Sequence, residues 1–365
     1  MVEKKIGRRS FIKKAAVGVA ASSILGPVYA QASPRVRWRL ATSWPESLDT
    51  IYGGATWIAK RVAELTDGRF TIEVHPAGEL TKPLEVLQAV QRGKVEAGHT
   101  AAYYYTQLHP AFAFATALPY GLTARQQNAW LEQGGGNELL NKELFEAYGI
   151  IGLPAGNTAL QMGGWFRFPV DTAEDFRGLK MRIPGLGGEV LKRVGVETVN
   201  LPASEILPAL EAGRIDATEW VGPYDDEKLG FYKVAAYYYY PGWWEPGTTL
   251  HALFNSRAFN KLPQTYREAL VAATREANAR VLSAYDQKNP PALERLIAYG
   301  VQLRPFPRDL LRLTFREAEN LYTELAEKDA TYRRIFNRWN QARTRLFRWF
   351  ATNESYYADF TFRLF

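Results

Sequence analysis

One stretch of this chain occurs twice. Residues 84–100 read LEVLQAVQRGKVEAGHT, and residues 204–220 read SEILPALEAGRIDATEW. Each copy shows helical spacing of apolar residues, then a glycine suited to the left-handed backbone that ends a helix, then a short apolar strand. The pairs that are identical in register are Glu85/Glu205, Leu87/Leu207, Ala89/Ala209, Gly93/Gly213 and Ala97/Ala217.

The context of the two copies is also alike. Each follows an apolar segment and a proline, TIEVHPAGEL in one case and VETVNLPA in the other, which predicts strand–helix–strand twice. Such a unit, repeated once at long spacing, predicts two similar α/β lobes that face each other across a crevice lined by strand carboxyl ends. The alternative is chance similarity between two ordinary helix–glycine–strand units. Two copies do not make a solenoid.

The N-terminus has the pattern of an export signal. Arg8 and Arg9 begin the twin-arginine motif RRSFIK, an apolar run follows from Ala15 to Leu25, and small residues stand at Ala30 and Ala32. The run is short of the ~20 apolar residues that span a bilayer. We therefore expect a twin-arginine signal peptide over residues 1–32, removed after one of these two alanines, and a soluble periplasmic protein. A retained amphipathic anchor is the alternative.

Composition excludes several classes of function. The chain has no cysteine, which rules out disulfides, thiolate metal sites, cysteine nucleophiles and a lipid-modified cysteine anchor. Residues 1–32 carry six Lys/Arg and one Glu, so they hold +5 of the net charge of +7 and leave +2 for the rest. No basic stripe indicates nucleic-acid binding.

The C-terminal region has its own pattern, an alternating 4/3 apolar spacing that only Asp329 and Arg343 interrupt. It predicts one helix from about Arg308 to Phe350, ~60 Å long at 1.5 Å per residue. We expect it to lie across both lobes, with the tail 349–365 exchanged between the subunits of a homodimer. A lobe-spanning helix in a monomer is the alternative. The spaced residues are Leu311, Phe315, Ala318, Tyr322, Leu325, Tyr332, Phe336, Trp339, Leu346 and Phe350.

The order of predicted elements also divides the chain. We expect residues 33–156 and about 246–285 to form lobe I. Residues 157–245 and about 286–307 form lobe II, and residues 308–365 form the C-terminal helix and tail.

Residues that follow the predicted strands are the candidates for a binding site in the crevice. Arg182 stands in the apolar context LKMRIPG, and its planar guanidinium suits a bidentate pair with a carboxylate. A structural ion pair with a local acid is the alternative. Glu219, Gln161 and Glu245 offer oxygen ligands of the kind that suit a hard cation, Na⁺ or Ca²⁺, although each type is also common in structural roles.

Catalytic motifs are missing. The four histidines show neither HExxH spacing nor clustering, no GxSxG sequence occurs, and the glycines at 185–188 lack the rest of a nucleotide-binding loop. The pattern favours a binding protein over an enzyme. An exported metal-assisted lyase or hydrolase acting on a small organic acid is the alternative, with His99 or Tyr103 moving protons.

The export signal, the repeated A[LV]xxG[KR][VI][ED]A segment, the KMRIPG motif and the long C-terminal helix resemble the solute-binding proteins of TRAP transporters. The resemblance covers essentially the whole mature chain. It implies a type II-like periplasmic-binding-protein fold whose two lobes close around an organic acid. The arginine matching Arg182 would clamp the ligand carboxylate, and a membrane permease would receive the ligand.

The pair Glu219-Trp220 departs from binders of sialic acid and dicarboxylates and is similar to the subgroup for lactate and 2-oxo acids. That likeness implies a metal held by Gln161, Glu219 and the Trp220 carbonyl, which chelates a carboxylate oxygen and the 2-oxo or 2-hydroxy oxygen of the ligand. The charges of Glu219, a monoanionic ligand and Arg182 sum to −1, which Na⁺ neutralises. When Glu245 is included, the sum is −2, which Ca²⁺ neutralises.

We expect Ca²⁺, with Na⁺ as the alternative. Tyr103 and Asn157 are expected to hydrogen-bond the ligand, and Trp220 and Trp243 to wall its pocket.

Overall fold

The computed structural model describes residues 34–364, and one compact unit begins at Val36. The predicted signal peptide lies outside the described residues. Within the described part, no helix combines the length and the apolar character needed to cross a bilayer.

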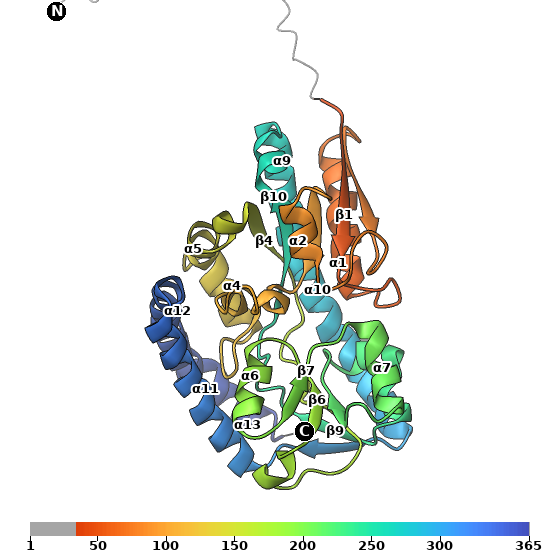
Figure 1. Cartoon of the computed structure of the whole chain (residues 1–365), viewed down its shortest axis with the longest axis vertical. Coiled ribbons are helices and arrows are strands. Elements are labelled where there is room, and N and C mark those ends of the chain that lie inside the picture. Colours follow the sequence, from red (N-terminus) through yellow and green to blue (C-terminus); the bar gives the residue numbers. More distant parts are fainter. Residues whose placement is uncertain (1–33, 365) are drawn as a thin grey trace, which may run out of the picture. The chain divides into compact units, whose positions relative to one another are not determined.

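The first of two sheets has five strands (Figure 1). Parallel pairing joins β1 to β2 and β3, and β10 runs antiparallel between β3 and β4. The strand order across the sheet is β2 (Phe70–His75), β1 (Val36–Thr42), β3 (Ala97–Thr100), β10 (Thr249–Asn255) and β4 (Ile150–Asn157).

The second sheet has six strands. β6 pairs in parallel with β7 and β8, whereas β5 is antiparallel to both β8 and β9. The order is β11 (Gln302–Pro305), β9 (Tyr237–Tyr240), β5 (Gly164–Phe166), β8 (Ala217–Thr218), β6 (Lys180–Arg182) and β7 (Glu197–Val199).

The sequence repeat occupies equivalent places in the two sheets. Its helices are α2 (Val86–Gln91) and α7 (Ala203–Glu211), and its strands are β3 and β8, each set between one parallel and one antiparallel neighbour. Gly93 and Gly213 have φ of +68° and +65°, as predicted for a left-handed helix end. The amides one residue later both bond to the carbonyl five residues back at 2.9 Å. The prediction of two similar α/β layers is confirmed.

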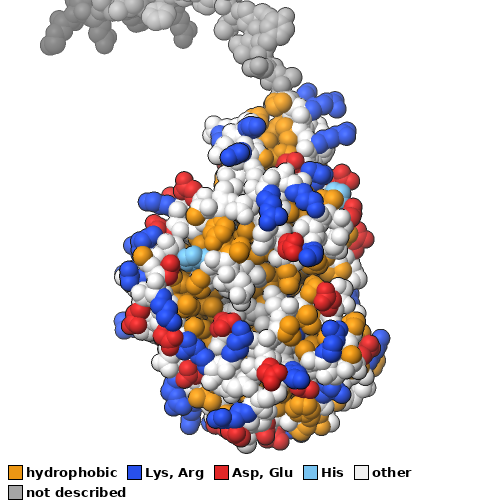
Figure 2. All heavy atoms as spheres, viewed as in Figure 1, with side chains coloured by type: hydrophobic (Ala, Val, Ile, Leu, Met, Phe, Trp, Pro, Cys, Tyr) orange, Lys and Arg blue, Asp and Glu red, His pale blue; other side chains and the backbone are white. Residues whose placement is uncertain are grey.

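The other short helices are α1 (Ile51–Leu65), α3 (Phe112–Thr116), α4 (Ala124–Glu132), α5 (Gly136–Glu143), α6 (Gly185–Arg193), α8 (Pro223–Leu229), α9 (Ser256–Asn260) and α13 (Tyr356–Thr361). Charged side chains of both signs are intermingled over the face shown in Figure 2, without a basic stripe.

The helix that spans both sheets is α10 (Gln264–Ala298), 35 residues long. It packs on α1 and β4 at one end and on α8 at the other. It contains Pro290 and Pro291, although a proline inside a helix costs ~3 kcal/mol or more. The helix continues because both flanks of the proline pair are fixed by packing, through Tyr285 on one side and Leu296 on the other, which are both fully buried.

The prediction of one helix from Arg308 to Phe350 is wrong. The chain forms α11 (Arg308–Lys328) and α12 (Ala330–Phe350), which fold back on each other as a hairpin (Figure 1). Asp329 breaks the helix in extended conformation, and its carboxylate caps α12 by accepting from the Tyr332 amide at 2.6 Å. Arg343, the other interruption of the pattern, pairs with Glu319 across the hairpin at 2.8 Å.

Candidate ligand-binding site

A small cavity lies where loops of the two sheets meet, with an empty volume of ≈250 Å³. Polar side chains gather on one part of its wall and aromatic and aliphatic ones on the rest. Its lining residues are Trp44, Ile51, Tyr103, Tyr104, Thr158, Gln161, Arg182, Trp220, Val221, Thr248 and Leu250.

Arg182 ends strand β6 and is only 1% exposed. Its Nε donates to the Leu201 carbonyl at 3.0 Å, and its Nη1 donates to both the main-chain and a side-chain oxygen of Glu219. The guanidinium also lies 5.1 Å from the Trp220 ring. These contacts fix the guanidinium plane and leave Nη2 without a hydrogen-bond partner.

Glu219 follows strand β8 and is fully buried. Burial raises the pKa of its carboxyl well above the ordinary value, the nearby charge of Glu245 adds to this, and Arg182 opposes both. One carboxylate oxygen pairs with Arg182, while the other, Oε2, has no partner. The site therefore contains a carboxylate that is short of positive charge.

Glu245 brings a second buried carboxylate. It belongs to residues 241–248, which connect β9 of the second sheet to β10 of the first. Its Oε2 accepts from the Tyr103 hydroxyl at 3.3 Å and from Thr248 Oγ1 at 3.2 Å. Burial raises its pKa to about 7, although Arg182 and these donors act in the opposite direction. Its protonation thus changes near neutral pH.

Gln161 joins the same cluster. Its main-chain amide donates to the Glu245 carbonyl at 3.2 Å, and its side-chain nitrogen donates to the hydroxyls of Thr158 and Thr248 at 2.9 and 3.2 Å. These bonds direct the amide group, whose oxygen has no partner.

Four buried polar atoms without partners are therefore grouped here: three belong to residues that line the cavity, and the fourth belongs to Glu219, which pairs with the lining residue Arg182. They are Nη2 of Arg182, Oε2 of Glu219, Oε1 of Gln161 and Nε1 of Trp220. A buried polar group without a hydrogen bond costs roughly 1–3 kcal/mol, and more when it is charged. Two donors and two acceptors, left open together, fit an anion and a cation bound side by side.

The donor set suits a hard cation. In the described part of the chain no group of three or more His, Cys, Asp or Glu could hold a metal ion. A cation here would rest on the carboxylates of Glu219 and Glu245, the amide oxygen of Gln161 and the Trp220 carbonyl, with the ligand completing its shell. All are oxygen ligands, as Ca²⁺ and Na⁺ prefer.

Two expected contacts lie elsewhere. Asn157 is fully buried, but its side chain bonds to the Gly247 carbonyl, the Thr249 hydroxyl and the Ala159 amide, and it does not line the cavity. It positions the loops that carry Gln161 and Thr248. Trp243 is not a pocket wall either, because it stacks on Tyr120 at 5.0 Å beside the C-terminal hairpin.

Sequence reasoning missed Trp44, Tyr104 and Thr248 as lining residues. Trp44 donates to His99 Nδ1 at 2.8 Å and lies edge-on to Trp220 at 6.4 Å. Its position two residues after the end of β1 is the signal that could have found it, since the rule that selected Glu219 selects residues that follow strands.

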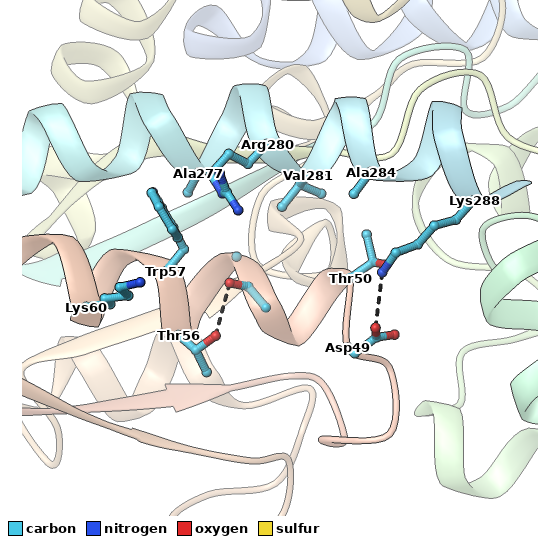
Figure 3. A pocket seen from close by; sticks show the side chains of 12 residues that line it. Asp49, Thr50, Thr56, Trp57, Lys60, Ala277, Arg280, Val281, Ala284 and Lys288 are labelled. Atoms are coloured by element: carbon cyan, nitrogen blue, oxygen red, sulfur yellow. Dashed lines mark hydrogen bonds and ion pairs between the residues drawn. The ribbon is translucent and has the colours of Figure 1, made fainter.

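A larger groove, with an empty volume of ≈930 Å³, runs along the surface between α1 and α10 (Figure 3). None of the buried polar atoms that lack a partner in the described residues belongs to its lining. The smaller cavity is therefore the candidate binding site.

Two α/β layers with a polar cavity between their loops, and a buried arginine in it, define a solute-binding protein. The model of the bacterial extracellular solute-binding proteins, family 7 (DctP), matches residues 40–329. This chain belongs to that family, which confirms the resemblance to TRAP transporter solute-binding proteins. Its members are binding receptors outside the cytoplasm, not enzymes.

The relatives include a monocarboxylate 2-oxoacid-binding periplasmic protein of Nostoc sp. (strain PCC 7120), 48% identical over 97% of this chain and 98% of its own length. A TRAP transporter solute-binding protein of Bordetella bronchiseptica RB50, a dimer with copurified calcium and picolinate, superposes with a TM-score of 0.89. It is 44% identical over 91% of this chain and 98% of its own.

A second solved structure, from Pseudoalteromonas atlantica T6c, holds sodium and pyruvate. Its TM-score is 0.86, at 37% identity over 89% of this chain and 99% of its own. A third, from Colwellia psychrerythraea, holds calcium and pyruvate; its TM-score is 0.86, at 36% identity over the same share of each chain.

Proposed function

We propose that this protein captures a small monocarboxylate as a metal complex and delivers it to the permease of a TRAP transporter. The ligand class is lactate, pyruvate or a related 2-oxo or 2-hydroxy acid. The observation that carries this proposal is the group of unpartnered donors and acceptors on and beside the wall of one small cavity. Relatives that bind pyruvate with calcium or sodium support it.

The open atoms of Arg182, Gln161 and Glu219 each have a role in this proposal. Arg182 Nη2 donates to the ligand carboxylate, and Tyr103 turns its hydroxyl from Glu245 toward the ligand when the cation arrives. Gln161, Glu219, Glu245 and the Trp220 carbonyl hold the cation, which supplies a Lewis-acid contact to the carboxylate and 2-oxo oxygens. The aromatic wall excludes water, so these charge interactions are strong.

Calcium fits the two carboxylates better than sodium does. Glu219 and Glu245, a monoanionic ligand and Arg182 sum to −2, which a divalent ion neutralises. If Glu245 keeps its proton, the sum is −1 and sodium suffices. The choice of ion therefore depends on Glu245.

Calorimetry tests the function. The protein, freed of metal with a chelator, is titrated with pyruvate and with lactate, each with and without Ca²⁺ and Na⁺. Gln161→Ala removes one proposed cation ligand, and Glu245→Gln should lower affinity for Ca²⁺ more than for Na⁺. Arg193→Ala, which breaks an exposed pair with Glu324, is the control. The proposal would be refuted if the affinity for pyruvate and lactate were the same with and without both metals. It would also be refuted if the ligand were recovered chemically altered.

We take each sheet as the core of one lobe, with boundaries near residues 156, 245, 285 and 307. Ligand binding then draws the lobes together, because each contributes part of the cavity wall. The linking segments include residues 241–248, on which Glu245 lies.

The C-terminal tail supports a homodimer. Helix α13 and the residue after it expose Tyr356, Tyr357, Phe360 and Phe362 by 66–78%, so four large apolar side chains within seven residues lie open to solvent. A second subunit would cover them. For export, we propose the twin-arginine route through Arg8 and Arg9.

A further inference from the structure

The carboxylate of Asp49 holds three contacts at once, away from the ligand cavity. Lys228 Nζ pairs with its Oδ1, and Lys288 Nζ at 3.1 Å and the Tyr224 hydroxyl at 3.0 Å both donate to its Oδ2. Both ammonium groups also lie over the Tyr224 ring, at 4.3 and 4.6 Å. Figure 3 shows Lys288 reaching from α10 to Asp49 at the end of the groove.

Asp49 belongs to the first sheet's side of the molecule. The loop that carries it follows β1, and Ser43 bonds to the His99 carbonyl and the Thr100 hydroxyl of β3. Trp44 of the same loop donates to His99. The loop thus moves with the first sheet.

The lysine and tyrosine of α8 belong to the second sheet's side. Asp226 of this helix accepts from Trp165 of β5 at 2.9 Å and from Tyr238 of β9 at 2.7 Å. These three side chains are fully buried or nearly so. Tyr224 and Lys228 are therefore fixed to the second sheet, and the Asp49 cluster ties the two sheets to each other.

The residues of the cluster are also close in sequence to residues on both walls of the cavity. Trp44 and Ile51, which line the cavity, flank the loop of Asp49. Trp220 and Val221, also in the lining, directly precede α8. Separating Asp49 from α8 would therefore move these two parts of the wall apart.

We propose that Asp49 is a latch that holds the two sheets together over the bound solute and sets its rate of release. The inference rests on the proposed function, since the solute is the small carboxylate described above. Asp49 touches no ligand in this arrangement and acts by positioning Trp44 and Ile51. Its side chain is 50% exposed and those of Lys228 and Lys288 about a third, so solvent and salt weaken each pair, but three contacts on one carboxylate act together.

The test is the rate of ligand release. Protein loaded with pyruvate and Ca²⁺ is mixed with excess chelator, and tryptophan fluorescence follows the opening. We expect Asp49→Asn to accelerate release about tenfold with little change in the association rate, because the latch opposes opening and Asp49 touches no ligand. Lys228→Met should act in the same direction, and the double variant should be no faster than the faster single one.

The matched control is Glu227→Gln. Glu227 lies on the same helix and pairs with Arg295 of α10 at 2.6 Å, without contact to the Asp49 loop. Its release rate should stay within twofold of the wild type. Choline chloride, which offers no competing metal ion, should accelerate release from the wild type and not from Asp49→Asn.

Release from Asp49→Asn at the wild-type rate would overturn the latch and leave the proposed function intact. Failure of the wild type to bind pyruvate or lactate refutes the proposed function instead. The latch is then judged without ligand, by spin labels on Lys82→Cys and Glu174→Cys in a chain that has no other cysteine. A distance distribution that Asp49→Asn does not broaden contradicts the latch.

Discussion

Arg182 and Glu219 form a buried pair in which one guanidinium nitrogen donates to both the side-chain and the main-chain oxygen of the glutamate. Each partner keeps one polar atom free, Nη2 on the arginine and Oε2 on the glutamate. The two side chains thus contact each other, and each still has an atom available. The arginine can bind an anion, and the glutamate can bind a cation. The two open atoms belong to one ion pair, which ties the two binding events together.

The first prediction is cooperativity between metal and ligand. A cation bound to Glu219 weakens the ion pair between Glu219 and Arg182. A ligand carboxylate bound to Arg182 compensates for this loss of negative charge beside the guanidinium. Pyruvate should therefore bind at least tenfold more tightly with saturating Ca²⁺ than with chelator, and Ca²⁺ should gain the same factor from pyruvate. Titration of each partner in the presence and absence of the other measures both factors. Independent affinities would contradict this account of the pair.

The second prediction separates folding from binding. Arg182→Ala leaves Glu219 buried without its cation and should lower the free energy of unfolding by about 3–5 kcal/mol. The double variant Arg182→Met with Glu219→Gln removes both charges and should recover most of that loss. Neither variant should bind pyruvate. Urea unfolding and calorimetry measure the two effects, and binding by the double variant would exclude Arg182 as the carboxylate clamp.

The third prediction concerns pH. The pKa of Glu245 is raised to about 7 in the folded protein, so the metal-free fold holds a proton that the unfolded chain releases near pH 4.5. This bound proton adds to the free energy of unfolding below the lower pKa. That contribution, up to about 3 kcal/mol, is lost as the pH rises through 7. Calcium binding shows the opposite trend, because the cation needs the ionised carboxylate, and should weaken below pH 7.

Unfolding at pH 5.5 and 8 in chelator, for the wild type and Glu245→Gln, checks the sign. The variant should lose part of the pH dependence only, since burial also raises the pKa of Asp225 to about 7 and that of Asp226 to about 6. A pH dependence that is identical in the variant would exclude Glu245 as its source.

The fourth prediction concerns assembly. Removing residues 351–365 takes away α13 and its exposed aromatic side chains and should convert a dimer into a monomer without loss of pyruvate affinity. Sedimentation velocity measures the oligomeric state, and calorimetry the affinity. Asp329→Ala is the comparison: it removes the cap of α12, should cost ~1 kcal/mol of stability, and should leave the oligomeric state unchanged. A truncated chain that still sediments as a dimer would contradict the role of the tail.

The repeat was enough to predict the two-sheet fold, because an apolar period and a glycine at a helix end are local signals. The same reasoning misjudged the C-terminal region. Apolar spacing continues across Asp329 in the sequence, whereas the chain turns back there, and the spacing marks the inner faces of two helices instead of one. An aspartate that interrupts such a pattern and suits a helix N-cap was the missing signal.

The candidate site was also only partly predictable from the sequence. Arg182, Glu219 and Gln161 follow from the rule that strand ends meet at the crevice, and the cavity brings them together. Asn157 obeys the same rule, yet its side chain is occupied by neighbouring loops. Which polar atoms are left open depends on hydrogen bonds between segments far apart in the sequence, and no local pattern contains that information.

The segment 241–248 carries Glu245 and is also a covalent tether between the two sheets. A cation bound by Glu245 would restrict the motion of this segment at its middle. Binding of metal and solute would therefore act on a connection between the two sheets. Metal-depleted protein should accordingly be cut faster by proteases within residues 241–248, and occupancy of the cavity would be readable from the rate of that cleavage.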